Sequence, residues 1–238
     1  MQAIKSVKLM VVILALFLMA VGNVLADPFD RTLPEIEGLP GMQLQWIGKK
    51  MAINGLPMSM RAFNSSSSAD QILDAYQGRW KTRGSAQTTR SEFDGAQSVG
   101  MEYRGHYYSV QAYDVSGGSQ GVLTVGLAPA KASPDFSTRF PLPLGSNVEQ
   151  KIEAIDNGKR METLIVTSQQ SVGSLAAYVN ASMRRQGWAE QNFGNTQPGH
   201  KERVLNFQRG AELSQIVVID NPPAYPGKTL MTVHWVKN

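Results

Sequence analysis

Cysteine is absent from this chain of 238 residues, and histidine occurs only three times. Without a thiol the chain has no disulfide, no thiol nucleophile, no thiolate metal site and no cysteine for a lipid anchor. The histidines, His106, His200 and His234, do not have the spacing of metal ligands. We therefore predict no metal site and no cofactor, and a fold that is stabilised by buried apolar area.

Long basic runs are also missing. No run of Lys and Arg is longer than two residues, and no basic stripe alternates with aromatic residues. Such runs and stripes are typical of proteins that bind nucleic acids. We therefore expect no nucleic-acid partner.

One long apolar run is present, at the N-terminus. Lys5 and Lys8 precede the apolar stretch Met10 to Val21, and small residues up to Ala26 are typical of a cleavage site. A retained membrane anchor is the competing interpretation, but a span needs about 20 apolar residues. We predict that residues 1–26 are a signal peptide cleaved after Ala26. The product would be periplasmic or secreted, without stable membrane insertion, and cleavage lowers the net charge from +4 to +2.

A repeated string of features indicates the architecture. Asn54-Gly55 and Asn157-Gly158 are each followed by a methionine, a strand-like apolar segment, serines, a tyrosine and a glycine. Recurrence of this kind predicts one supersecondary unit used twice. We expect an α+β fold of two tandem repeats, each an antiparallel sheet with one helix packed on one face, ββαβββ-like. The predicted segments are an extended Pro/Gly-rich leader (27–42), a first module (43–129), a Pro-rich linker (130–146) and a second module (147–238).

Local signals define the elements of each module. Asn-Gly favours a type I′ turn and therefore a hairpin. Ser68 with Gln71 three residues later resembles a capping box, and Ser171 is the expected N-cap of the second helix. Alternation predicts further strands at 98–104, 107–115, 121–128, 203–208, 213–220 and 228–237, after hairpin strands that include 148–156 and 159–167.

The candidate catalytic motifs do not have the local structure that their chemistry requires. The segment 117–121 matches the G-x-S-x-G nucleophile elbow at Ser119, but a strand rather than a helix is expected after it. Glu35 with Glu37 lies in the Pro/Gly-rich leader, and Asp70 suits a helix N-terminus. We predict no catalytic residue and no enzymatic activity.

The remaining candidates lie on strand surfaces. Tyr107, Gln111 and Tyr113 alternate with apolar residues, so they should lie on the face that the helix does not cover. Residues 216–219 are apolar on both faces, and such a strand needs two covers: the helix, and the other module, the linker or a partner. The predicted interaction surface consists of Tyr107, Gln111, Tyr113, Val217, Ile219 and His234.

These features lead to two hypotheses for function. The first is an exported, non-enzymatic interaction or accessory protein that binds another protein of a cell-envelope assembly or secretion system. The alternative is a periplasmic glycan- or peptide-binding module, in which Tyr107, Tyr113 and Trp46 supply stacking faces. A hydrolase that uses Ser119 is the third and weakest interpretation.

Overall fold

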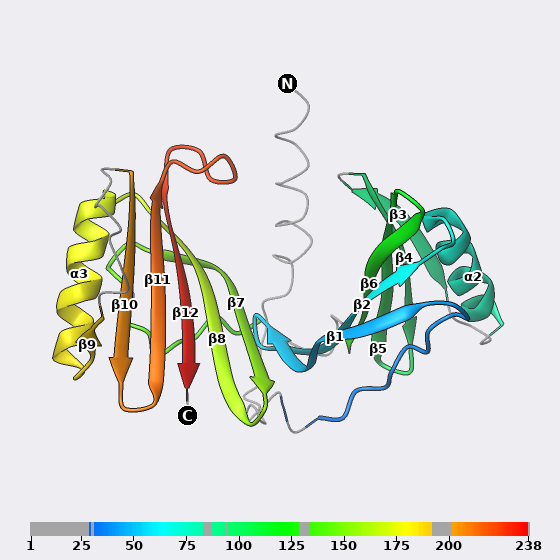
Figure 1. The fold of residues 1–238 in the computed structure, drawn as a ribbon, viewed down its shortest axis with the longest axis horizontal. Coiled ribbons are helices and arrows are strands. Elements are labelled where there is room, and N and C mark those ends of the chain that lie inside the picture. Colours follow the sequence, from blue (N-terminus) through cyan, green and yellow to red (C-terminus); the bar gives the residue numbers. More distant parts are fainter. Residues whose placement is uncertain are drawn as a thin grey trace.

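The computed structural model describes residues 29, 31–82, 87–93, 95–128, 134–191 and 201–237. The described residues form an α+β fold with two helices and a sheet of twelve strands, in which every neighbouring pair is antiparallel (Figure 1). The predicted signal peptide and His200 lie outside the described residues. The expected α+β class with mostly antiparallel pairing is therefore confirmed.

Each half of the chain begins with a hairpin followed by a helix. Asn54 and Asn157 have φ angles of 52° and 48°, as the predicted Asn-Gly turns require. The first half consists of β1 (Gln43–Ile53), β2 (Leu56–Ser65), α2 (Ala69–Lys81), β3 (Thr88–Phe93), β4 (Ala96–Tyr103), β5 (His106–Val115) and β6 (Gly118–Leu127). The second half consists of β7 (Asn147–Asp156), β8 (Lys159–Ser168), α3 (Val172–Arg185), β9 (Ala189–Glu190), β10 (Glu202–Arg209), β11 (Glu212–Asp220) and β12 (Thr229–Lys237).

The helix termini follow the local signals. The Ser68 hydroxyl accepts from the Gln71 N–H, and the Gln71 side chain accepts from the Ser68 N–H, so the predicted capping box is present. Ser171 caps α3 by accepting from the Ser174 N–H at 3.2 Å. Gly187 follows α3 with a φ of +81°, which is readily adopted by glycine.

The expectation of two separate sheets is wrong. The strand order is β3-β4-β5-β6-β2-β1-β7-β8-β12-β11-β10-β9, so β1 and β7 join both halves in one sheet. Their ladder pairs residues 50–53 with residues 152–155. Two strands were also missed: β3 and the two-residue β9 lie at the sheet edges.

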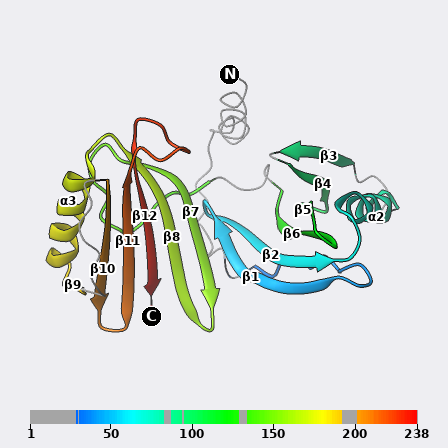
Figure 2. The same ribbon diagram turned by 45° about the horizontal axis from the view of Figure 1, so that its top comes forward.

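Both helices cover the same face of this sheet. Each packs over a separate core, which includes Phe63 and Tyr76 in the first half and Leu164 and Phe207 in the second. Figures 1 and 2 show α2 and α3 near opposite ends of the molecule. A path of residues on one face leads from the first core to the second and shows that both cores lie on that face. It alternates along β2 from Phe63 to Pro57, crosses paired strands through Ala52, Glu153 and Glu162, and alternates along β8 to Leu164.

The leader and the linker also pack on the helix-covered face. Ile36 of the leader is buried in the first core, and the Tyr76 hydroxyl donates to the Glu37 carbonyl at 2.9 Å. Phe140 of the linker is buried in the second core, and the Tyr178 hydroxyl of α3 donates to the linker carbonyl of Leu142. The described part of the Pro-rich linker therefore contributes to the second core.

Strand β1 is irregular in its middle. Its register with β2 shifts between Trp46 and Gly48 and again between Gly48 and Met51. Bulges of this kind bend a strand and redirect its side chains. β1 is curved in Figure 1, just where it approaches β7.

Candidate functional site on the helix-free face

The face opposite the helices runs without interruption through both halves. Because β1 and β7 pair, a single row of directly paired residues crosses eight strands on this face. The members are all apolar except for the Tyr107 hydroxyl: Tyr107, Gly126, Met58, Met51, Ala154, Met161, Val236 and Leu213. We call this set the apolar row. At the usual spacing of about 4.8 Å between strands, eight strands extend over roughly 34 Å along a flat sheet.

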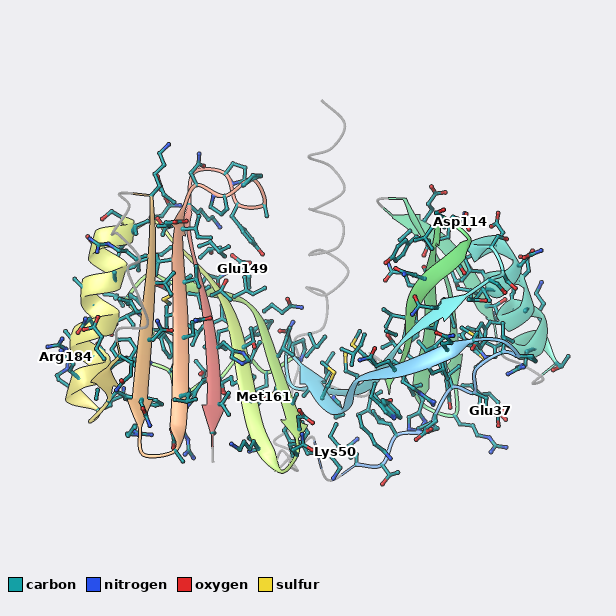
Figure 3. The ribbon with its side chains drawn as sticks, viewed as in Figure 1. Glu37, Lys50, Asp114, Glu149, Met161 and Arg184 are labelled. Atoms are coloured by element: carbon teal, nitrogen blue, oxygen red, sulfur yellow. The ribbon has the colours of Figure 1, made fainter. Side chains whose placement is uncertain are left out.

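The ends of the apolar row are its most accessible part. Tyr107 is 41% exposed and Leu213 is 47% exposed, whereas Met51 at the centre is 9% exposed. Met161 lies in β8 beside the junction of the halves (Figure 3). Methionine is flexible and polarizable, so a methionine-rich centre can adapt to different partner shapes.

The six predicted surface residues all lie on this face. Tyr107, Gln111 and Tyr113 occupy alternate positions on β5, opposite the buried side of that strand. Val217 and Ile219 alternate with the buried Ile216 and Val218 on β11. His234 is exposed on β12 between Val233 and Trp235, which are buried. The three β5 residues and the three residues of β11 and β12 therefore lie on one face of the sheet, but in different halves of the chain.

Each tyrosine has a defined contact. Tyr107 lies over Gly100, where a side chain at position 100 would collide with its ring and hydroxyl group. The Tyr113 hydroxyl donates to the Gln120 side chain at 3.1 Å, and Tyr113 is 44% exposed. These contacts orient both rings while leaving much of each accessible.

The described part of the linker does not cover the helix-free side of β11, although the sequence had left that arrangement open. Phe140 of the linker packs in the core under α3, on the opposite face from Val217 and Ile219. Both β11 residues are half-buried. His234 has a polar neighbour on the same face, with its Nδ1 3.0 Å from the Thr163 hydroxyl. On this face Tyr107, Tyr113 and Leu213 are exposed, and Val217 and Ile219 are half-buried.

The junction that makes this face continuous is stabilised by Asn54. Asn54 is 7% exposed; its N–H donates to the Lys151 carbonyl at 2.7 Å, and its side chain accepts from the Lys151 N–H at 2.8 Å. The Lys151 ammonium is 3.2 Å from Glu153 and donates to the Ser137 carbonyl at 2.8 Å. The turn of one half is thus bonded directly to the first strand of the other.

Asp135 completes this junction from the linker. Its N–H donates to the Asn54 carbonyl at 2.6 Å, and its carboxylate is 3.7 Å from the Lys151 ammonium. Burial raises the pKa of Asp135, but hydrogen bonds from Ser137 and the charge of Lys151 outweigh it, so the pKa lies below its ordinary value. The carboxylate is therefore charged where it faces Lys151.

Two other sequence candidates lie elsewhere. Trp46 pairs with Arg61, which shares a face with the core residue Phe63, so Trp46 is on the helix-covered face and not beside Tyr107. Ser119 is 1% exposed inside β6, and a strand rather than a helix continues after it. The three proposed aromatic platforms therefore do not form one surface.

The sequence analysis missed the central residues of the apolar row. Met51, Met58 and Met161 come from both halves and meet only because β1 pairs with β7. Their alternation on a strand is visible in the sequence, but the pairing of two edge strands is not. The methionine after each Asn-Gly turn, Met58 and Met161, is the one signal that pointed to them.

No group of three or more metal-ligating side chains occurs among the residues that the structure describes. None of the helices in the described ranges is both long and apolar enough to cross a membrane. Comparisons with protein families, with curated proteins and with solved structures found no match.

Proposed function

We propose that this protein is an exported, non-enzymatic interaction protein that uses the helix-free face of its sheet to bind another protein of a cell-envelope assembly or secretion system. The observation that carries the proposal is the apolar row, which extends from Tyr107 to Leu213 across both halves. The two ends of the row, Tyr107 and Leu213, are exposed, and exposed apolar side chains that gather on one face are typical of interaction sites.

The composition of the face favours a protein over a small ligand. A small molecule needs a concave site that buries most of its surface. Three cavities on the helix-covered side are lined by leader, core or β1 residues, such as Ile36 and Trp46. A broad sheet face with aromatic and methionine side chains instead resembles the composition of protein interfaces. We expect a partner with an elongated apolar ridge that lies along the row.

We also infer that the two halves are copies of one unit. In support, the order β3-β4-β5-β6-β2-β1 in the first half corresponds to the order β9-β10-β11-β12-β8-β7 in the second. In both halves the helix follows the first hairpin. The pairing of corresponding strands, β1 with β7, gives the sheet an approximate two-fold arrangement.

The alternative is a glycan- or peptide-binding module. Tyr107 and Tyr113 are on the same face of β5, so a chain ligand that stacks on both remains a testable alternative. Binding of envelope polysaccharide or peptidoglycan fragments that is lost on replacing both tyrosines, without any protein partner, would favour it.

Site-specific photo-cross-linking tests the proposed face. A photo-reactive residue at Gln111, between the two tyrosines, should form one discrete adduct with an envelope protein in intact cells. The same residue at Ala177, which is exposed on α3, serves as the matched control. The double change Tyr107→Ser and Tyr113→Ser should abolish the Gln111 adduct, whereas Tyr178→Ser on α3 should leave it unchanged. A monomer with no adduct at Gln111, or equal adducts at both positions, would refute the proposal.

A further inference from the structure

A cavity on the helix-covered side has no part in the interaction proposed above. It lies between the leader and β1, has a volume of about 320 Å³, and is lined by Arg31, Glu35, Trp46, Lys49 and Lys50 among others. Volumes of this size are at the lower end of those of ligand sites. We call it the leader cavity. Lys50 lies at the junction of the two halves (Figure 3).

The charges around the leader cavity are unbalanced. Its carboxylate, Glu35, forms an ion pair with Arg61 at 2.9 Å. Arg31, Lys49 and Lys50 have no ion pair among the described residues, and all three are exposed. Three cations and one carboxylate, which is already paired with Arg61, line this concave site, so its potential is positive and attracts an anion.

Trp46 supplies an apolar wall beside these charges. Its ring has the Arg61 guanidinium 4.5 Å from the centroid and the Lys49 ammonium at 5.8 Å, and the residue is 39% exposed. On the leader side Phe29 is buried, with the Arg160 guanidinium of the second half 4.8 Å from its ring centroid. The cavity thus combines cations, an accessible indole and apolar leader residues.

The bulges of β1 explain how the two lysines reach this position. Both register shifts lie between Trp46 and Met51, and Lys49 and Lys50 lie within the second. In a regular strand consecutive residues point to opposite faces. A bulge breaks this alternation and can direct neighbouring side chains to one region, which is why bulges occur often beside binding sites.

We propose that the leader cavity binds a small organic anion, a sugar-sized molecule that carries a phosphate or carboxylate group. Arg31, Lys49 and Lys50 bind the anionic group by charge-assisted hydrogen bonds. The accessible part of the Trp46 indole contacts the ring of the ligand. This site is on the opposite face from the apolar row, so the two activities are separable.

Tryptophan fluorescence of the mature chain provides the readout. Trp46 is 39% exposed, whereas Trp80, Trp188 and Trp235 are at most 5% exposed, so a change caused by a ligand reports on Trp46. Glucose 6-phosphate and glucuronate are the anionic probes, with glucose as the neutral control. We expect a saturable change with at least one anion and none with glucose, with calorimetry giving the same affinity.

A pair of matched variants tests the residues. Lys49→Ala with Lys50→Ala should weaken anion binding by about ten-fold or more, because two charged contacts are lost. Lys81→Ala with Lys159→Ala removes the same charge from exposed positions outside the cavity and should leave the affinity unchanged. Failure of both anions to bind, equal binding of glucose, or equal weakening in both double variants would overturn the proposal. The Gln111 adduct should persist in both variants, which separates this result from the function proposed above.

Discussion

Replacing Asn54 with glycine should weaken the junction of the two halves selectively. Glycine adopts the φ of 52° without strain, so the turn itself is kept. The Asn54 side-chain acceptor is lost, which leaves the buried Lys151 N–H without its bond of 2.8 Å. An unsatisfied buried donor costs about 1–3 kcal/mol. We expect Asn54→Gly to lower the free energy of unfolding by that amount in urea titrations.

Asn157 is the control that the chain itself offers. It occupies the corresponding turn with a φ of 48°, but it is exposed. Asn157→Gly should therefore change the free energy of unfolding by no more than about 0.5 kcal/mol, as is usual for surface substitutions. Hydrogen exchange of the Lys151 amide should accelerate only in Asn54→Gly. Equal destabilisation by both substitutions, with unchanged exchange at Lys151, would refute this account of the junction.

Three further predictions concern the first core, the helix termini and the bulge of β1. Burial raises the pKa of Tyr76 to about 12, above its value near 10 in the unfolded chain. The free energy of unfolding should therefore fall by roughly 2–3 kcal/mol between pH 10 and pH 12. In urea titrations Tyr76→Phe should remove this fall, and an unchanged dependence on pH would contradict the prediction. Ser68→Ala should lower the free energy of unfolding by about 1 kcal/mol. Ser171→Ala should lower it by a similar or smaller amount, because only Ser68 has the reciprocal bond of a capping box. A larger loss of stability in Ser171→Ala would contradict this prediction. Gly48→Ala should lower the melting temperature, because a side chain at position 48 would collide with that of Met51, and overpacking costs about 1–3 kcal/mol.

Local structure was predictable from the sequence because its causes are local. The Asn-Gly turns need positive φ at the asparagine, and the cap at Ser68 needs only a partner three residues away. The alternation around Tyr107 and His234 correctly gave the faces of β5 and β12, because side chains alternate along any strand. These predictions required no knowledge of how the halves meet.

The junction was not predictable for the opposite reason. Residues 50–53 and 152–155 are about a hundred residues apart, and the backbone groups that pair them are common to all amino acids. The bulges of β1 likewise depend on its register with β2 and not on a local motif. The expectation of two sheets therefore failed at the one place where two edge strands meet. The candidate surface was predicted in two parts, and its continuity came only from the structure.

A disulfide across the junction tests whether the halves work as one surface. Ile53 and Ile152 are directly paired on the helix-free face, next to the hydrogen-bonded pair of Asn54 and Lys151. The Cα atoms of such non-hydrogen-bonded pairs are about 4.5 Å apart, within the range that a disulfide accepts. The natural chain has no cysteine, so Ile53→Cys with Ile152→Cys can form one intramolecular bond only.

The oxidised double variant should be more stable by up to about 4 kcal/mol, because the bond closes a loop of about a hundred residues. If the partner binds the continuous apolar row, locking β1 to β7 keeps that row intact, and the Gln111 adduct should form as in the natural chain. Bond formation is followed by the mobility shift on non-reducing gels. Failure of the bond to form under oxidant would contradict the pairing of β1 with β7. Loss of the Gln111 adduct on oxidation, with recovery on reduction, would mean that the partner binds only when the two halves separate.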